Sequence, residues 1–387
     1  MQYITRQLKL GNTAQLRKLS LECGTTYSLI VTTFWRVYRN KNHWLSSNAM
    51  QKIIKNNNLH SQTVQGIIQS FYEALKSWSS LREGNQNARP PRKHRRFYAI
   101  PFKSSAIKLN NNVLMLSTGR GNDPIMVPWK NDTPKFCEIS FKGGQYVLNA
   151  VYPVTVSSKS TGDKYAGLLV GKTHIGAVSF GADTHIANGR ELRSKYLYRD
   201  KTYSSFKSKL DKCTIGSRKW KRLDEARWRT ITRLNNQIKD ILHKQTTALV
   251  CAMKSKGVQT VGIGNMQNIK LDNGCVEDLR PGRHHIPVSK IKELFAYKAE
   301  LAGIEVVHQK SQLRHACPVC VEHNETSTLN YSCSSCGFQS HRYSVGAVNI
   351  SHFTKYREHV PVVGDMTPPV GIRYNANRLR KSATAVA

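Results

Sequence analysis

Two CxxC pairs near the end of the chain place the strongest constraint on how this sequence folds. Cys317 and Cys320 lie in CPVC, and after twelve residues Cys333 and Cys336 lie in CSSCG. Structural Zn²⁺ takes four ligands at the corners of a tetrahedron, and each CxxC turn presents two thiolates. Four protein ligands leave no position for water, so the sequence predicts one structural zinc in a ribbon over residues 310–338. A redox-active pair is the weaker alternative, because one CxxC would be enough for it.

The charge balance predicts a polyanionic partner. The 387 residues include 59 Lys and Arg against 24 Asp and Glu, a formal net charge of +35. Self-repulsion on that scale opposes a compact state unless a polyanion such as nucleic acid neutralises it. A uniformly basic surface with no fixed partner is the alternative. A membrane surface is disfavoured, because the sequence carries neither an acylation motif nor a strongly amphipathic terminal helix.

The sequence also bears on location. No run approaches the roughly 18 apolar residues of a membrane-spanning helix, and the opening MQYITRQLKL lacks the apolar block of a signal peptide. We therefore expect a reducing, cytoplasmic setting. In that setting CxxC pairs favour metal binding over disulfides.

Cations gather in two segments. RPPRKHRRF, residues 89–97, follows a helical region, and residues 203–256 form a long basic stretch with apolar residues at helical spacing, which predicts a helical hairpin. Such density indicates contact with phosphate, although basic helix faces are often only solvated. The candidate contacts are Arg92, Lys93, Arg95, Arg96, Arg218, Lys219, Lys221, Arg222, Arg227 and Arg229.

A third candidate surface lies on the helix predicted for LHSQTVQGIIQSFYEALKSW. Its apolar residues, from Val64 to Trp78, form one stripe at helical spacing. Gln62, Gln65 and Gln69 lie on a different face, where their amides could reach base edges or a phosphate. A merely solvated polar face is the alternative.

The remaining pattern predicts a mixed chain. An alternating strand opens it, helical spacing covers residues 14–82, and short strands punctuated by Gly, Asn and Pro fill residues 98–157 as a small barrel or sandwich. YAGLLVGKTHIGAVSF, residues 165–180, predicts the first hairpin of a mixed sheet. VQTVGIGNM, residues 258–266, predicts a buried strand.

This order of segments resembles TnpB, the RNA-guided nuclease of bacterial insertion sequences and a relative of type V CRISPR effectors. The segments that carry the resemblance are LHSQTVQGIIQSF, YKAELAGIEVV, CPVC with CSSCG, and HRYSVGAVNI. It implies a multidomain α/β fold, in which an RNase H-like (RuvC) mixed sheet holds an inserted zinc ribbon. An N-terminal β-barrel, the wedge, would carry an inserted helical recognition domain.

The resemblance also implies domain boundaries. The wedge would cover residues 1–157, with its helical insertion at about 14–82. The RuvC-like domain would cover residues 163–309, including the basic hairpin at 203–256, and would end with residues 339–356 after the ribbon. Residues 357–387 would form a flexible tail.

In this family two divalent ions are held by three carboxylates, and here each of those positions carries another residue. The Asp of the G-I-D-x-G strand corresponds to Leu169, the strand-ending Glu to Gly264, and the Asp of H-R-D to Tyr343. Some relatives supply an acid just before the zinc knuckle, but here that stretch reads HQKS. Because carboxylates are what hold such ions, we expect no catalytic residues, no catalytic Mg²⁺ and no enzyme activity.

The function implied by the resemblance is RNA-guided DNA binding without cutting. A guide RNA would pair with one strand of a DNA duplex, forming an RNA–DNA heteroduplex next to a short flanking motif. One protein per guide is expected, and transcriptional repression is the expected use. Two alternatives stay open. One is a Mg²⁺-dependent nuclease with relocated acids, for which Asp183, Asp272, Glu277 and Asp278 are candidates; the other is an RNA-binding accessory factor that never engages DNA.

Overall fold

The computed structural model describes residues 2–93, 96–155, 162–171, 173–264, 287–309, 316–324, 328–358, 361 and 366–376. The chain divides into two compact units, one formed by Tyr3–Pro153 and the other by Val154–Ala387 with Met1–Gln2. Among the helices of the described ranges, none has a stretch both long and apolar enough to cross a bilayer.

The N-terminal unit combines three helices with two antiparallel sheets. Its helices are α1 (Ala14–Lys41), α2 (Ser47–Ile53) and α3 (Ser61–Gly84). The Thr13 and Ser46 hydroxyls accept backbone N–H bonds at the starts of α1 and α2, as N-caps do. Its strands are β1 (Gln2–Leu10), β2 (Ile100–Lys103), β3 (Ile107–Asn110), β4 (Val113–Leu116), β5 (Ile125–Pro128), β6 (Phe136–Lys142) and β7 (Gln145–Val154), with a short 3₁₀ turn, η1, at Ser104–Ala106.

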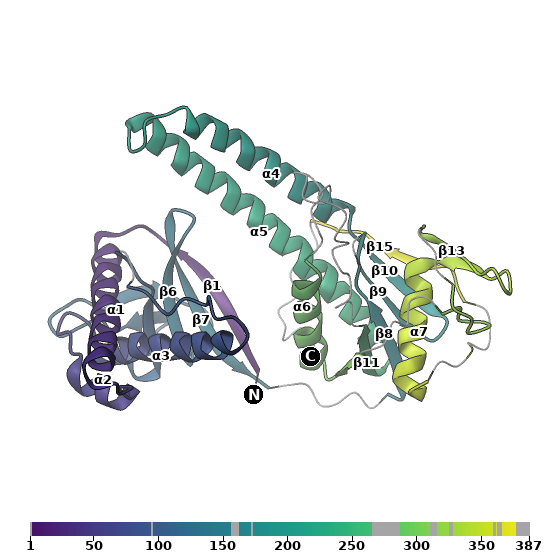
Figure 1. The fold of residues 1–387 in the computed structure, drawn as a ribbon, viewed down its shortest axis with the longest axis horizontal. Coiled ribbons are helices and arrows are strands. Elements are labelled where there is room, and N and C mark those ends of the chain that lie inside the picture. The colour runs from purple at the N-terminus through teal and green to yellow at the C-terminus, as the bar shows by residue number, and fades with distance from the viewer. Residues whose placement is uncertain are drawn as a thin grey trace. The chain divides into compact units, whose positions relative to one another are not determined.

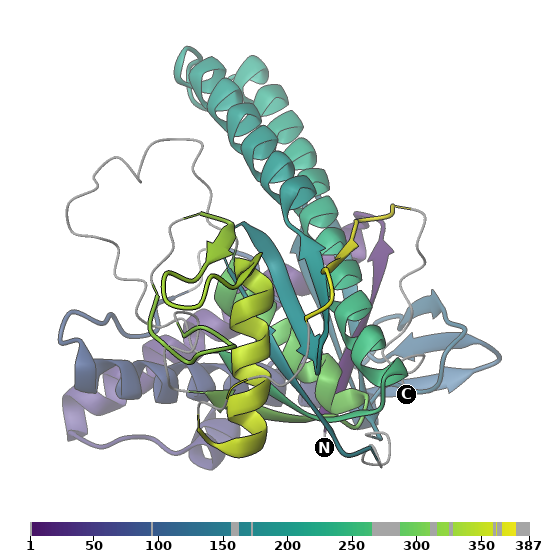
Figure 2. The same ribbon diagram turned by 90° about the vertical axis from the view of Figure 1, so that its right-hand side faces the viewer.

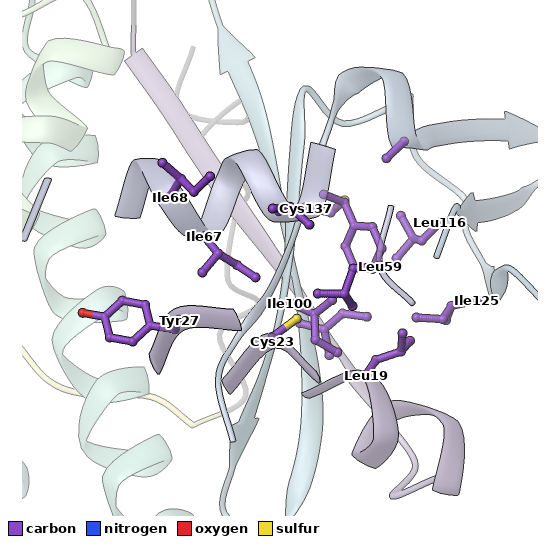
Figure 3. Packing of buried hydrophobic residues seen from close by; sticks show 14 of the residues in the cluster. Leu19, Cys23, Tyr27, Leu59, Ile67, Ile68, Ile100, Leu116, Ile125 and Cys137 are labelled. Atoms are coloured by element: carbon purple, nitrogen blue, oxygen red, sulfur yellow. The ribbon is translucent and has the colours of Figure 1, made fainter. Parts of the chain in front are cut away.

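The strands of this unit pair as two sheets. Four form a sheet in the order β1-β7-β6-β2, and three form a sheet in the order β3-β4-β5. One hydrophobic core joins the helices to both sheets, and Figure 3 shows side chains from it. Leu19 and Cys23 come from α1, Ile67 from α3, Ile100 from β2 and Leu116 from β4. The predicted strand-rich segment therefore exists as two antiparallel sheets that share a core.

The C-terminal unit is built on a six-stranded mixed sheet in the order β12-β11-β8-β9-β10-β15. Strand β9 runs antiparallel to both β8 and β10, whereas β11 runs parallel to β8, β12 runs parallel to β11 and β15 runs parallel to β10. The bounds are β8 (Lys164–Leu169), β9 (His174–Phe180), β10 (Asp183–Asn188), β11 (Val258–Gly264), β12 (Glu305–Gln309) and β15 (Val370–Ile372).

Helices cover both faces of this sheet (Figures 1 and 2). On one face, α5 (Arg218–Ser255) and α6 (Val288–Leu301) share a core with Leu168 and Ile263. On the other, α7 (Arg342–Tyr356) packs beside Leu169. Gly167 permits this close approach, because a Cβ there would lie 2.1 Å from the Ala347 carbonyl oxygen. Neighbouring strand residues thus face opposite helical layers, as a pleated strand requires.

The basic helical hairpin begins earlier than the sequence predicted. Its first helix, α4, covers Arg190–Asp211 and runs against α5, so the hairpin starts thirteen residues before the expected Tyr203. Only Leu192 and Leu210 are buried on α4. With so few buried positions, α4 lacks the apolar stripe by which amphipathic helices are recognised in a sequence.

Candidate metal centre and nucleic-acid interface

The four predicted cysteines converge on one point. Their sulfur atoms all lie within 4.8 Å of one another. The Sγ atoms of Cys317 and Cys336 are 3.6 Å apart, as are those of Cys320 and Cys333. Zn–S bonds of about 2.3 Å place tetrahedral sulfurs about 3.8 Å apart, so the cluster fits a tetrahedral metal ion.

The two CxxC turns share one backbone pattern. In the first, the Cys317 N–H donates to the Glu322 carbonyl and the Val321 N–H donates to the Cys317 carbonyl. In the second, the Cys333 N–H donates to Phe338 and the Gly337 N–H to Cys333. The residue after each second cysteine is left-handed, with φ of +65° at Val321 and +73° at Gly337. Sequence inspection identifies the glycine but gives no sign of the strained valine.

The electrostatics of the cluster favour a thiolate at Cys333, whereas burial and the neighbouring sulfur atoms raise the pKa of the Cys320 and Cys336 thiols. Backbone N–H groups of Cys336 and Ser335 point at Cys333 and lower the pKa of its thiol to about 6. Because the thiolate is the form that binds metal, the backbone supports ligation before any ion is bound. Among the described residues the cluster has no further ligand, so its four cysteines would provide a closed structural metal site.

The cysteine cluster is attached to the start of α7. It packs in a small core with Tyr331 and Val345, of which Val345 belongs to α7. The Asn349 side chain donates to the Ala316 carbonyl over 2.7 Å, and the Arg342 N–H donates to the Leu329 carbonyl over 2.8 Å. Strands β13 (Asn330–Ser332) and β14 (Gln339–His341) complete the ribbon and lead directly into α7. The cluster therefore positions the helix that carries Tyr343.

The three positions expected to carry carboxylates lie at one edge of the mixed sheet, namely the edge formed by the C-terminal ends of β8 and β11. Leu169 ends β8 and Gly264 ends the neighbouring parallel strand β11, with Ile263 opposite Leu168. Leu169 and Tyr343 belong to one apolar cluster and are 8% and 7% exposed. A Cβ at Gly264 would lie 2.7 Å from the end of the Ile350 side chain, which belongs to the same cluster. Apolar side chains therefore fill this edge.

Tyr343 is fixed in that cluster by its hydroxyl. The oxygen accepts the backbone N–H of Thr173 over 3.0 Å and that of His174 over 3.4 Å. Gly171 makes room for it, because a Cβ at that position would lie 2.1 Å from the Tyr343 hydroxyl oxygen. The phenol thus joins the start of α7 to the turn between β8 and β9. Sequence reasoning identified Tyr343 but not these partners.

Two histidines border the phenol. The ring centroids of His174 and Tyr343 are 4.8 Å apart, and those of His174 and His341 are 5.4 Å apart. Burial, followed by the nearby charges of His341 and Arg190, lowers the pKa of His174 to about 4. Both His174 ring nitrogens are buried, and neither has a hydrogen-bond partner among the residues that the structure describes. A positive charge is therefore disfavoured beside Tyr343.

The candidate replacement acids do not gather at this edge within the described residues. In those ranges, the four cysteines form the only group of three or more His, Cys, Asp or Glu side chains close enough to share a metal ion. Asp183 lies at the start of β10 and pairs with Lys256 over 3.1 Å, which lowers the pKa of its carboxyl. Gln309 ends β12 and donates to the Thr354 hydroxyl over 3.1 Å. Asp272, Glu277 and Asp278 lie outside the described residues.

The basic segment after α3 is held against α1 at its far end. The Tyr98 N–H donates to the Ser20 carbonyl over 3.0 Å, and the Ser20 hydroxyl donates to the Tyr98 carbonyl over 2.7 Å. Gly24 allows the crossing, because a Cβ there would lie 2.2 Å from the Arg96 carbonyl oxygen.

This crossing brings an unpredicted cation to the segment. The guanidinium groups of Arg17 and Arg96 lie 6.0 and 5.6 Å from the centroid of the Phe97 ring. Arg92, Lys93 and Arg96 are exposed, whereas Arg95 lies outside the described residues. Sequence reasoning missed Arg17, because it stands some eighty residues before its neighbours in space.

The predicted glutamine face lies on α3. Gln62 and Gln65 are partly buried and Gln69 is exposed. The Gln69 amide donates to the Glu73 carboxylate over 2.9 Å. Gln69 is thus the most exposed of the three glutamines, but its amide already has an intramolecular partner.

The structure separates the predicted cations of α5 into two groups. Arg218, Lys219, Lys221, Arg222 and Arg229 are exposed. Arg227 faces α4 instead: it pairs with Asp224 and lies 5.7 Å from the centroid of the Tyr203 ring. The exposed group gains Arg233, which sequence reasoning passed over and which follows Arg229 by one helical turn.

Comparison with known proteins adds two family matches. Residues 149–270 match a family described as a probable transposase, OrfB_IS605, and residues 289–350 match the Cas12f1-like TNB domain. Curated proteins give no match. The first segment contains β8 to β11 with the basic hairpin, and the second contains the cysteine cluster and most of α7.

Among solved structures, one shows a similar fold with a TM-score above 0.5. The cryo-EM structure of a Cas12f1–sgRNA–target DNA complex matches with a TM-score of 0.61 at 13% identity, covering 87% of this chain and 82% of that one. A CRISPR-Cas12f ternary complex gives 0.36 at 12% identity, covering 87% and 80%. CasPhi-2 (Cas12j) bound to crRNA and phosphorothioate DNA gives 0.42 at 8% identity, covering 95% and 92%.

The predicted family is therefore confirmed. Apart from residues 149–153, the two family matches lie in the unit that holds the mixed sheet and the cysteine cluster, and the likeness to Cas12f1 extends over both units. The chain thus carries a segment of the OrfB_IS605 family and a segment of the Cas12f1-like TNB family, as its resemblance to TnpB predicted, and its fold is similar to that of Cas12f1.

Proposed function

We propose that this protein binds DNA under the direction of a guide RNA and does not cut it. The observation that carries the proposal is the apolar cluster at the edge of the mixed sheet: Leu169 and Tyr343 belong to it, and Gly264 lies against its Ile350 side chain. Two-metal hydrolysis of a phosphodiester needs clustered carboxylates that hold both ions near the attacking and leaving oxygens. An apolar cluster offers hard divalent ions no ligand and excludes the water they would retain.

The geometry also supports a stable arrangement without ions. In a nuclease of this kind, metal ions would neutralise the acids that converge at the edge of the sheet. Here the Tyr343 hydroxyl joins α7 to the β8–β9 turn, and Leu169 packs beside it. The strand order and directions of the mixed sheet support an RNase H-like (RuvC) assignment for this domain, and the two N-terminal sheets support a wedge with a helical insertion.

The partners are inferred from the relatives and from charge. The Cas12f1 structure is named as a complex with a guide RNA and a target DNA. This chain carries a formal net charge of +35 and exposed cations on α5 and after α3. Counterion release from phosphates would then supply much of the binding free energy, and base pairing with the guide would supply the sequence specificity.

The cysteine cluster would hold one structural zinc through Cys317, Cys320, Cys333 and Cys336. The ion would keep the ribbon folded against the start of α7, and it would take no part in chemistry because all four positions are filled by protein. A DNA-bound complex that persists because nothing is cleaved would block transcription, which is the use we propose for it in a bacterial cytoplasm.

The proposal is tested on the complex purified with its own RNA. Sequencing that RNA identifies the guide segment, and a labelled duplex matching the guide is then incubated with the complex in Mg²⁺ or Mn²⁺. We expect a guide-dependent footprint, intact strands, and repression of a reporter that carries the target in its promoter. Severed strands would instead indicate a nuclease with relocated acids. RNA binding without any footprint on the duplex would indicate an accessory factor.

A further inference from the structure

The outer half of the α4–α5 hairpin carries many charged residues that the hydrophobic core does not require. The two helices run away from the sheet side by side (Figures 1 and 2). The buried residues of α5 begin only at Leu234, so residues 218–233 contribute none to the core. Residues 190–233 nevertheless contain fifteen Lys and Arg against five Asp and Glu. This part of the hairpin is therefore a cationic arm with little core of its own.

One face of the arm carries a row of four arginines. Arg218, Arg222, Arg229 and Arg233 are separated by four, seven and four residues, a spacing that puts them on the same side of α5. All four are exposed, and none forms an ion pair with a carboxylate in the part of the chain that the structure describes. We call these four residues the arginine row. Unpaired guanidinium groups along one face fit the phosphates of a nucleic-acid strand.

An exposed tryptophan lies beside the row. Trp228 is 55% exposed, although a ring of its size contributes most to a fold when it is buried. Lys221 lies two turns earlier on the same side of the helix, and Arg229 of the arginine row is the next residue. An exposed aromatic ring bordered by cations is the arrangement with which proteins stack unpaired bases.

The ring is held in place by the hairpin. The Arg227 guanidinium lies 5.4 Å from the centroid of the Trp228 ring and 5.7 Å from that of Tyr203 on α4. Asp224 fixes the same guanidinium through an ion pair. Arg227, which the sequence predicted to contact phosphate, thus links the two helices and supports the tryptophan. A ring held before binding loses less conformational entropy when a base stacks on it.

We infer that Trp228 stacks an unpaired base of the guide RNA while the arginine row contacts the backbone of the same strand. The occupant is single-stranded or looped RNA, because a base within a duplex presents no free face to an aromatic side chain. This inference rests on the proposed function for its choice of RNA, and it adds a base-stacking site. Failure of duplex targeting would leave the stacking site standing, since it concerns RNA alone.

The test measures binding of a fluorescent 20-nucleotide single-stranded RNA to the RNA-free full-length protein over a range of salt concentrations. Trp228→Ala should weaken binding about tenfold at every salt concentration, and Trp228→Phe should retain most of the affinity. Because Trp228 carries no charge, the slope of log affinity against log salt should not change. Arg229→Gln should reduce that slope by about 0.7, the value for one lost single-strand phosphate contact.

Ile215 provides the matched control. It is 83% exposed in the turn between the two helices, so Ile215→Ala also removes an exposed apolar side chain from the arm. RNA affinity should be unchanged in this variant. Unchanged affinity in Trp228→Ala would overturn the inference. If that variant instead altered the sedimentation of the RNA-free protein, the ring would be a protein–protein contact, and the stacking site would likewise be rejected.

Discussion

Tyr343 occupies a position expected to carry a metal-binding carboxylate, and its side chain is instead part of the apolar core. Tyr343→Phe keeps the ring but removes the oxygen that accepts the N–H groups of Thr173 and His174, so two backbone donors lose their acceptor. We expect the free energy of unfolding to fall by about 1–3 kcal/mol, measured by denaturant titration. Tyr356→Phe on the same helix removes a hydroxyl from a 46% exposed ring and should change it by less than about 0.5 kcal/mol. Equal effects of the two substitutions would contradict the anchoring role of Tyr343.

His174, which lies beside that ring, should make the stability of the protein sensitive to acid. Burial lowers its pKa in the folded state to about 4, below the usual 6.5, so the unfolded chain binds a proton that the folded chain does not. The contribution of His174 to stability is therefore complete above about pH 6.5 and is lost as the pH falls towards 4. His174→Phe should flatten the decline in unfolding free energy between pH 7 and pH 5. An equally steep decline in the variant would assign the acid sensitivity to other groups.

At the scale of elements, the two CxxC turns differ at one position. Val321 holds a β-branched side chain at φ +65°, whereas Gly337 holds the equivalent φ of +73° without strain. Val321→Gly should raise the unfolding free energy of the zinc-loaded protein by about 1 kcal/mol, because relief of about 1–2 kcal/mol of backbone strain exceeds the added chain entropy. Gly337→Ala in the other turn should lower it by a similar amount. Changes of the same sign in both variants would show that φ does not decide the effect.

Elements with strict local spacing were predictable, and contacts made across the fold were not. The CxxC spacing gave the cysteine cluster, and alternating or helical apolar patterns gave α3, β8 and β11, since these signals lie within a few residues. The start of α4 was missed because so few of its residues are buried. The roles of Arg17 and Arg227 were hidden for another reason. Each is defined by a ring or backbone that another segment brings beside it, Phe97 in one case and Tyr203 in the other.

At the scale of the whole molecule, the effect of the net charge of +35 on RNA binding depends on where the cations lie. A uniformly basic surface would attract any polyanion and would respond equally to the loss of any four cations. The arginine row instead places four exposed guanidinium groups along one face of a helix. Organised contacts of this kind are expected to release counterions together, whereas scattered exposed lysines act only through the general field of the protein.

Replacing the arginine row with glutamines distinguishes these cases. The fourfold variant of Arg218, Arg222, Arg229 and Arg233 should reduce the slope of log RNA affinity against log salt by about 3, because each single-strand phosphate contact contributes about 0.7. The same charge change at Lys52, Lys55, Lys108 and Lys130, all exposed, should leave most of the slope intact. If the slope fell equally in both variants, RNA binding would depend on the total charge and not on the positions of the cations. The arginines of α5 would then have no special role in holding RNA.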